Sequence, residues 1–239
     1  RKEHRMILRR PTANPRRTLA GLALGLMASL GAVTAQPYAY VVNSTTNTVT
    51  IIDTSTATVR GPVVVGLSPS RVAVSPDSTR AYVTNSGSSS ISVVDPAAMS
   101  VVRILPTGAS PTSIAVTPDG QRIYAATSGG LQVIDAVSGA VITTIPGITQ
   151  GDIAFTPDGS RAYVAAGNLT MVDTATHAVT TTAINTAGSL AIAPNGLRLY
   201  ATTTGADIFG SGGAVQIVDT ATNTVTGNIA LGALPGSLG

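Results

Sequence analysis

Few residues in this sequence could act as acids, bases, nucleophiles or metal ligands. None of its 239 residues is Cys, and only His4 and His177 are histidines. A Ser-His-Asp assembly would require His177 beside a serine and an aspartate, and Asp173 is its nearest acid in sequence. The surrounding residues instead indicate a turn, in which we expect His177 to be exposed. With no Cys and one histidine outside the first 35 residues, the sequence predicts no catalytic residue, no metal site, no haem attachment and no cofactor.

One aspartate recurs at a nearly constant distance. The series is Asp53, Asp95, Asp135, Asp173 and Asp219, with separations of 42, 40, 38 and 46 residues. Carboxylates could bind Ca²⁺, but a calcium site needs roughly six to eight oxygens that converge on one point, and each of these aspartates occupies its own repeat. We therefore assign them to turns.

A series of tyrosines keeps step with the aspartates. It comprises Tyr40, Tyr82, Tyr124, Tyr163 and Tyr200, separated by 42, 42, 39 and 37 residues. Two independent markers indicate a repeated unit of roughly 40 residues. Each unit divides into four short runs rich in Val, Ile, Thr and Tyr, bounded by Gly, Pro, Asn and Asp, which is typical of β-strands. We expect helix to be nearly absent.

Two kinds of turn punctuate each unit. The first follows the first strand and reads SPDS, TPDG, TPDG or APNG. Proline presets its φ for the first central position of a type I turn, Asp bonds nearby backbone N–H groups, and Gly accepts a positive φ. The residues that we assign structural roles there are Asp77, Asp119, Asp158 and Asn195. The recurring aspartates end the third strand and begin the second kind of turn, as in DTSTATV.

Four-stranded antiparallel units of this length predict an all-β protein built from the blades of a β-propeller. The stretch SPDSTRAYVTN, with NTVTIIDTSTATV before it, resembles the YVTN-type β-propeller repeat family, and the match runs from Tyr38 to about Gly239. The resemblance implies an exported or surface-associated propeller. Because the final LPGSLG only begins another first strand, we expect an incomplete ring, in which the sequence either is a C-terminal fragment or continues beyond Gly239. We expect a propeller domain over 36–239 with about five blades, near 38–66, 71–108, 112–147, 150–186 and 188–232.

Residues 1–35 differ in composition from the rest. They hold seven Lys and Arg residues against one acid, whereas from Gln36 onward seven Arg face ten Asp, a net charge of 7 − 10 = −3. The basic start, the apolar run TLAGLALGLMASLGAV and VTA before Gln36 are typical of a cleaved signal peptide. A retained anchor is the alternative, although the run is short for a spanning helix. We expect an exported protein (periplasmic, secreted or at the cell surface), with membrane contact only through an uncleaved signal segment. The lack of clustered positive charge after residue 35 argues against nucleic-acid binding.

The variable loops are the best candidates for a binding site. In an antiparallel meander both kinds of turn fall on one edge of the sheets. The loops from second to third strand and from fourth to first fall on the opposite edge, which we call the loop edge. These loops are rich in Asn, Ser, Thr and Gly, which suits adaptable hydrogen bonding. The candidate binding residues are Arg71, Asp152, Asn43, Asn85, Ser88, Asn168 and Asp207.

The sequence favours an exported, non-catalytic scaffold whose partner is an unknown protein, glycan or cell-wall component. The alternative is a propeller enzyme or redox accessory domain, because relatives of this repeat resemble lactonases and haem d1 proteins. Such sites use clustered histidines, acids or metal ligands, whereas Arg71 and Asp152 are the only charged residues in their register at the start of a first strand. Blades missing from this chain would have to supply the other residues.

Overall fold

β-strands make up almost every element of the chain. The computed structural model describes residues 38–203 and 213–230. Within these ranges the only other element is the 3₁₀-helix Ser86–Ser88, and no helix is long and apolar enough to cross a membrane. The signal segment predicted for 1–35, with His4, lies outside the described residues, as does Asp207. The strands are β1 (Tyr38–Asn43), β2 (Thr48–Asp53), β3 (Thr58–Val64), β4 (Pro69–Val74), β5 (Ala81–Asn85), β6 (Ser90–Asp95), β7 (Ser100–Pro106), β8 (Pro111–Val116), β9 (Arg122–Thr127), β10 (Gly130–Asp135), β11 (Val141–Ile145), β12 (Ile153–Phe155), β13 (Arg161–Ala166), β14 (Asn168–Asp173), β15 (Val179–Ile192), β16 (Arg198–Thr203), β17 (Ala214–Asp219) and β18 (Thr224–Ala230).

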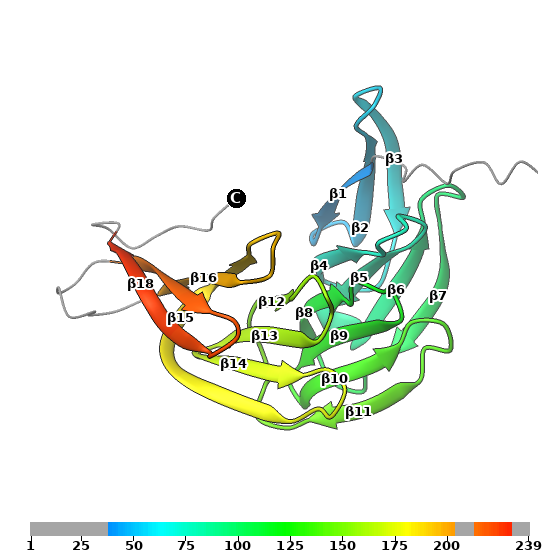
Figure 1. The fold of residues 1–239 in the computed structure, drawn as a ribbon. Coiled ribbons are helices and arrows are strands. Elements are labelled where there is room, and N and C mark those ends of the chain that lie inside the picture. The colour runs from blue at the N-terminus through cyan, green and yellow to red at the C-terminus, as the bar shows by residue number, and fades with distance from the viewer. Residues whose placement is uncertain (1–37, 204–212, 231–239) are drawn as a thin grey trace, which may run out of the picture. The chain divides into compact units, whose positions relative to one another are not determined.

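The strands form antiparallel sheets in chain order (Figure 1). Strands β4–β7 and β8–β11 form four-stranded sheets, and β1–β3 form a three-stranded one. Strands β12–β18 form a seven-stranded sheet because β15, 14 residues long, belongs to two units. At one end of β15, Val179 pairs with Val172 of β14, and at the other end Ile192 pairs with Leu199 of β16. The predicted all-β class with four-stranded antiparallel units is confirmed.

We number the units blade 1 to blade 5 along the chain. Blade 1 is β1–β3, blade 2 is β4–β7 and blade 3 is β8–β11. Blade 4 is β12–β14 with the first half of β15, and blade 5 is the second half of β15 with β16–β18. By sequence, β1 corresponds to the second strand of the other blades, so the described part of blade 1 begins at that strand.

The hairpin between the first and second strands is built alike in blades 2 to 5. The N–H of the fourth turn residue donates to the carbonyl of the first over 2.8 Å in each. The four donors are Ser78, Gly120, Gly159 and Gly196, all with a positive φ of 58–73°. The side chain of the third turn residue accepts the N–H two positions further on, as Asp119 does from Gln121 at 3.0 Å. These bonds are local, so the turn is specified by its own few residues.

The turn between the third and fourth strands is organised by the aspartate that begins it. Asp135 Oδ1 accepts the N–H groups of Val137 at 3.2 Å and Ser138 at 2.6 Å, and the other four turns repeat this pattern. The fifth residue of each turn is left-handed, with φ of 54–69°. These residues are Ala57, Met99, Gly139, His177 and Asn223. The left-handed region costs free energy for Ala and Met, less for Asn and least for Gly.

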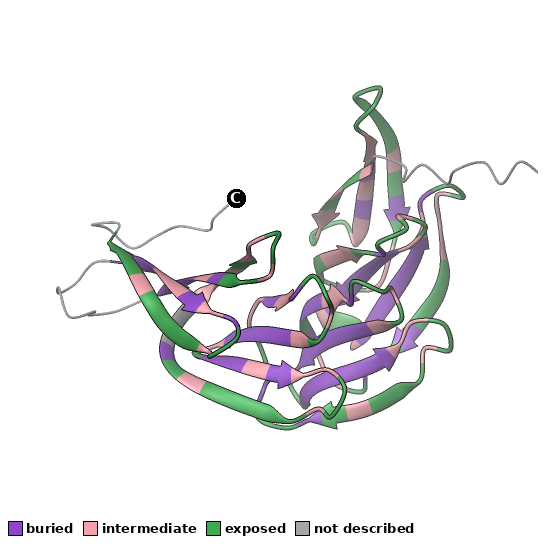
Figure 2. Ribbon diagram, in the orientation of Figure 1, coloured by how far each residue is buried: buried purple, intermediate pink, exposed green. Residues whose placement is uncertain are grey.

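Apolar residues are buried between consecutive blades. Four clusters each draw their side chains mainly from two neighbouring blades. Between blades 3 and 4, for example, Tyr124 meets Phe155 edge to face with ring centroids 5.0 Å apart. The first strands also lie against one another in order, β4 with β8, β8 with β12, and β12 with β15. A blade between two others is therefore buried on both faces, and Figure 2 shows this burial in strands such as β9 and β10.

Ala57→Gly should stabilise the protein. Ala57 is exposed and holds a left-handed position at φ 54°, so glycine would relieve strain without removing a buried contact. We expect the free energy of unfolding, measured by urea denaturation, to rise by about 1 kcal/mol. Gly139→Ala is the converse substitution, and it should lower the free energy of unfolding. Its φ is 69°, and the added Cβ would lie 2.5 Å from Leu105 Cδ2. Loss of stability in the first variant, or a gain in the second, would contradict this explanation.

Candidate functional site: the loop edge and the turn edge

The loops of the loop edge are hydrogen-bonded to one another. In the loop from blade 1 to blade 2, Ser68 N–H donates to Asn47 Oδ1 at 2.9 Å. The Ser68 carbonyl accepts the N–H of Ser86 at 3.0 Å and its hydroxyl at 2.9 Å. Leu67 N–H donates to Ser88 Oγ at 3.2 Å. These bonds join loops of the same blade and of neighbouring blades, so this part of the edge is one connected surface.

Two of the candidate asparagines bond within their own blades. Asn85 is fully buried, and its Nδ2 donates to Ser92 Oγ at 3.0 Å and Ser90 Oγ at 3.3 Å. Asn43 makes the equivalent bond in blade 1, from Nδ2 to Thr50 Oγ1 at 2.9 Å. Because Asn85 exposes none of its surface, it supports the loop edge from within and presents nothing to a partner.

The two charged candidates lie at the starts of first strands and do not pair with each other. Asp152, just before β12, ties blade 4 to blade 5, because its Oδ2 accepts the Leu190 N–H at 3.0 Å. Its Oδ1 accepts the Ile153 N–H at 3.1 Å. Arg71 in β4 is exposed, and its guanidinium has no hydrogen bond or ion pair with any described residue. Asp152 therefore joins two blades, whereas Arg71 presents a positive charge at the loop edge.

The remaining candidates are spread along the edge. Ser88 in blade 2 and Asn168 at the start of β14 in blade 4 are exposed. The side chain of Asn168 makes no hydrogen bond to a described residue, while Ser88 Oγ is held by Leu67 N–H and by Ser90 Oγ at 3.0 Å. The exposed candidates thus come from separate blades and do not form one cluster.

His177 lies in the third-to-fourth turn of blade 4, but it is partly buried and not exposed as the sequence suggested. This turn position faces the preceding blade, since its counterpart Asn223 accepts the Tyr163 hydroxyl through Oδ1 at 2.6 Å. The Nε2 of His177 is buried without a partner. Asp173 binds N–H groups of its own turn at 3.1 and 2.7 Å. Across residues 38–203 and 213–230, no group of three or more His, Asp or Glu could hold a metal ion.

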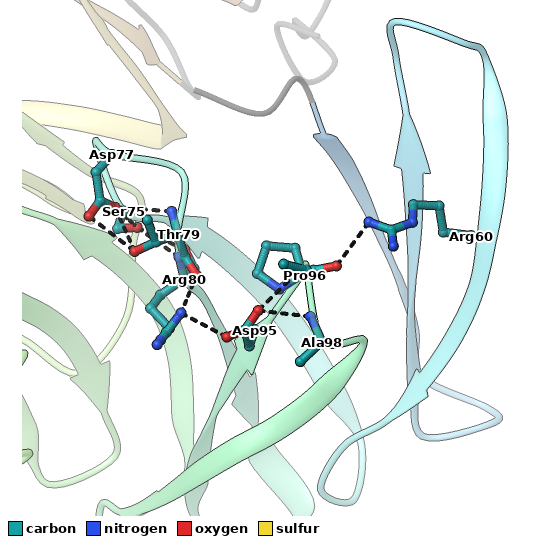
Figure 3. Close-up of polar contacts among 9 residues, drawn as sticks. Arg60, Ser75, Asp77, Thr79, Arg80, Asp95, Pro96 and Ala98 are labelled. Atoms are coloured by element: carbon teal, nitrogen blue, oxygen red, sulfur yellow. Dashed lines mark hydrogen bonds and ion pairs between the residues drawn. The ribbon is translucent and has the colours of Figure 1, made fainter. Parts of the chain in front are cut away.

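The edge opposite the loops, formed by the two kinds of turn and called here the turn edge, carries contacts that the sequence analysis missed. Arginines of one blade donate to backbone carbonyl oxygens in the third-to-fourth turn of the next, and Figure 3 shows the first of them. The pairs are Arg60 with Pro96 (3.1 Å), Arg103 with Val137 (2.7 Å), Arg122 with Thr174 (2.8 Å) and Arg161 with Thr220. Arg122 and Arg161 follow the first hairpin of their blades, whereas Arg60 and Arg103 lie in the fourth strands β3 and β7, so no single spacing in the sequence signalled all four contacts.

The turn aspartates accept N–H groups of their own turn, so the turn carbonyls can accept hydrogen bonds from arginines of the preceding blade. In the turn drawn in Figure 3, Asp95 Oδ1 accepts the Ala98 N–H at 3.0 Å, and the Pro96 carbonyl accepts from Arg60 of blade 1. The Asp95 Oδ2 atom also pairs with Arg80 of its own blade at 3.1 Å. One turn therefore satisfies its own N–H groups and bonds the preceding blade at the same time.

Hydrogen bonds hold the pKa of seven turn-edge aspartates below the usual range. The main donor is a hydroxyl group for Asp53, Asp77, Asp119 and Asp158, and a backbone N–H for Asp135, Asp173 and Asp219. Because the folded pKa is the lower one, these bonds stabilise the fold fully above the unfolded pKa of about 3.9 and are lost as pH falls through the folded values.

We therefore expect the melting temperature to be nearly constant from pH 7 to about pH 5 and to fall progressively below about pH 4. Thermal unfolding followed by circular dichroism at several pH values measures this. A melting temperature that stays constant or rises as pH falls from about 4 to about 2.5 would show that these carboxylates do not stabilise the native turns.

Arg122→Gln should destabilise the protein by about 1–2 kcal/mol, because it removes a charge-assisted hydrogen bond between blades 3 and 4. Arg71→Gln is the matched control. Its guanidinium bonds no described residue, so we expect a change within about 0.5 kcal/mol. Urea denaturation measures both, and equal effects would mean that the arginine bridges do not hold the blades together.

Comparison with known proteins shows the fold. No protein-family model and no curated protein matches the chain. Among solved structures it resembles hydrazine synthase from Kuenenia stuttgartiensis, with a TM-score of 0.70 and 25% identity, over 86% of this chain and 66% of that chain. It also resembles the dihydro-heme d1 dehydrogenase NirN in complex with DHE, with a TM-score of 0.68 and 19% identity, over 84% of this chain and 46% of that chain. The chain thus spans less than two thirds of either protein. Both neighbours are β-propeller proteins, and this chain shares their propeller fold.

Proposed function

We propose that the chain is an exported, non-catalytic β-propeller of the YVTN type that binds a partner through its loop edge. The repeated sequence around SPDSTRAYVTN supports the family, and the basic and apolar segment 1–35 supports export. The partner is a protein, a glycan or a cell-wall component, because polar loops of this composition contact such ligands through many hydrogen bonds.

The observation that carries the proposal is an exposed Arg71 on an edge whose loops are already held in place. The bonds of Ser68 to Asn47 and Ser86 order these loops before a partner arrives, so binding costs less conformational entropy. The only other charge in the register of Arg71, on Asp152, is engaged by the backbone of blade 5. The edge therefore offers a positive charge that suits a partner rich in hydrogen-bond acceptors.

Loop-edge substitutions should weaken partner binding. A glycan array and pull-down experiments with the exported chain identify the ligand, and isothermal titration calorimetry then measures its affinity. Arg71→Ala and Asn168→Ala each remove an exposed side chain that bonds no described residue, so they should leave stability unchanged. We expect at least one of them to weaken binding about fivefold or more.

Two control variants separate binding from folding. Gln121→Ala removes an exposed side chain on the turn edge and should leave affinity unchanged. Asn85→Ala removes a buried side chain and should lower stability. A ligand whose affinity falls in neither Arg71→Ala nor Asn168→Ala, or falls equally in Gln121→Ala, would refute the loop edge as the binding surface.

A propeller enzyme or redox accessory domain is the second candidate. The observation that favours it is the likeness to hydrazine synthase and to NirN, which was solved in complex with DHE. In this candidate the loop edge would border a substrate or cofactor site, and Arg71 would contact an acidic group. Visible absorbance spectroscopy and metal analysis of the protein purified from an exporting host distinguish the two functions. A chromophore or a stoichiometric metal would favour the second candidate over the scaffold.

A further inference from the structure

Cavities lie between consecutive blades at the turn edge. They occupy 460 Å³ between blades 2 and 3, 290 Å³ between blades 3 and 4, and 360 Å³ between blades 4 and 5. Each is lined by the first hairpin of both blades and by the third-to-fourth turn of the second blade. The three sites are therefore equivalent in the repeat, and their differences come from individual substitutions.

The cavity between blades 2 and 3 lacks the threonine contact that closes the other two. At the next interface, Arg122 crosses to the Thr174 carbonyl, and the Thr174 hydroxyl donates to the Gly159 carbonyl at 2.7 Å. Between blades 2 and 3 the threonine is replaced by Ala136, and Arg80 pairs with Asp95 of its own blade. The threonine hydroxyl is absent there, the arginine bridge comes instead from Arg103 of β7 to the Val137 carbonyl at 2.7 Å, and this cavity is the largest of the three.

The repeated tyrosine at this cavity, Tyr82, has no hydrogen-bond partner among the described residues, as is also the case for Tyr40 and Tyr124 in the two neighbouring blades. Between blades 4 and 5, the Tyr163 hydroxyl donates to Asn223 Oδ1 at 2.6 Å. The counterpart of Asn223 in blade 3 is Gly139, which has no side chain to accept the Tyr82 hydroxyl. Tyr82 is 4% exposed, lines the cavity, and has no hydrogen-bond partner among the described residues. A polar group in this position gains a hydrogen bond when a ligand supplies one.

The charges around this cavity favour a cation. Asp77 of blade 2 and Asp119 of blade 3 both line it, and hydroxyl donors hold the pKa of each below the usual range. The charge of Arg80 is offset by Asp95 at 3.1 Å. Asp77 and Asp119 therefore line the cavity beside one arginine that is already paired, and Arg122 of blade 3 contributes to lowering the pKa of Asp119. Apolar surface from Pro76, Ala136 and Val137 completes the lining and suits an aliphatic chain.

We propose that the cavity between blades 2 and 3 binds an organic cation, an ammonium group carried on a short aliphatic chain such as a lysine side chain. The carboxylates of Asp77 and Asp119 and the Tyr82 hydroxyl accept its N–H groups, and the aliphatic part lies against Pro76 and Val137. Its volume is within the range of small-molecule sites. This second site lies on the turn edge and does not depend on the partner proposed for the loop edge.

Isothermal titration calorimetry with 1,5-diaminopentane tests the proposal, with 1,5-pentanediol as the uncharged probe of the same length. We expect one equivalent of the diamine to bind, binding to weaken as salt is raised, and the diol not to bind. Tyr82→Phe removes only the unpartnered hydroxyl and should weaken diamine binding about fivefold. Asp77→Asn should weaken it by a similar factor. Ala136→Thr should also weaken it, because it restores the threonine that narrows the equivalent cavities.

Asp158→Asn is the matched control, because it makes the same change in the same turn motif at the neighbouring interfaces. We expect it to leave diamine affinity unchanged. Thermal unfolding of each variant verifies folding, and Tyr82→Phe tests the site even if Asp77→Asn fails to fold. No binding of the diamine at millimolar concentration, equal binding of the diol, unchanged affinity in Tyr82→Phe, or an equal loss in Asp158→Asn would each overturn the proposal.

Discussion

The bonding of an aspartate to the N–H groups of its own turn is the interaction on which the contacts between blades depend. With its N–H groups satisfied, the third-to-fourth turn offers carbonyl oxygens to arginines of the preceding blade, as Pro96 does to Arg60. The same turn directs its fifth residue at the preceding blade, where Asn223 accepts the Tyr163 hydroxyl. A local turn thereby supplies the directional bonds that align one sheet with the next.

Apolar burial supplies the non-directional part of this contact. Clusters such as the one around Tyr124, Val133 and Ile153 are buried between neighbouring blades, and area removed from water is the main favourable term in folding. Burial alone would tolerate small sliding movements between sheets. The arginine and tyrosine bonds at the turn edge restrict this freedom, because hydrogen bonds weaken steeply with misalignment.

The loop edge and the turn edge differ in how regular their sequences are, and each carries one of the proposed binding sites. The loop edge varies in sequence, yet bonds such as Ser68 with Asn47 connect its loops, and Asn85 stabilises it from within. The turn edge is repetitive, which suggested a purely structural role. At one interface, however, Ala136 replaces the threonine of the two following interfaces, and Tyr82, whose hydroxyl has no partner among the described residues, lines the cavity there. A substitution that departs from the repeat can therefore indicate a binding site, just as a variable loop can.

The sequence by itself determined the repeats, the strands and both kinds of turn, because these depend on residues that are neighbours along the chain. Asp119 and Asp135, for example, bond backbone groups two or three positions away. Only the tertiary structure showed that Asn85 is buried, that Asp152 bonds Leu190, and that β15 runs through two blades. It also decided which carbonyl each arginine reaches and that the hydroxyl of Tyr163 has a partner whereas those of Tyr40 and Tyr124 have none. These features join residues far apart in the chain, where spacing along the sequence says little about distance, and they depend on how each sheet stacks on the next.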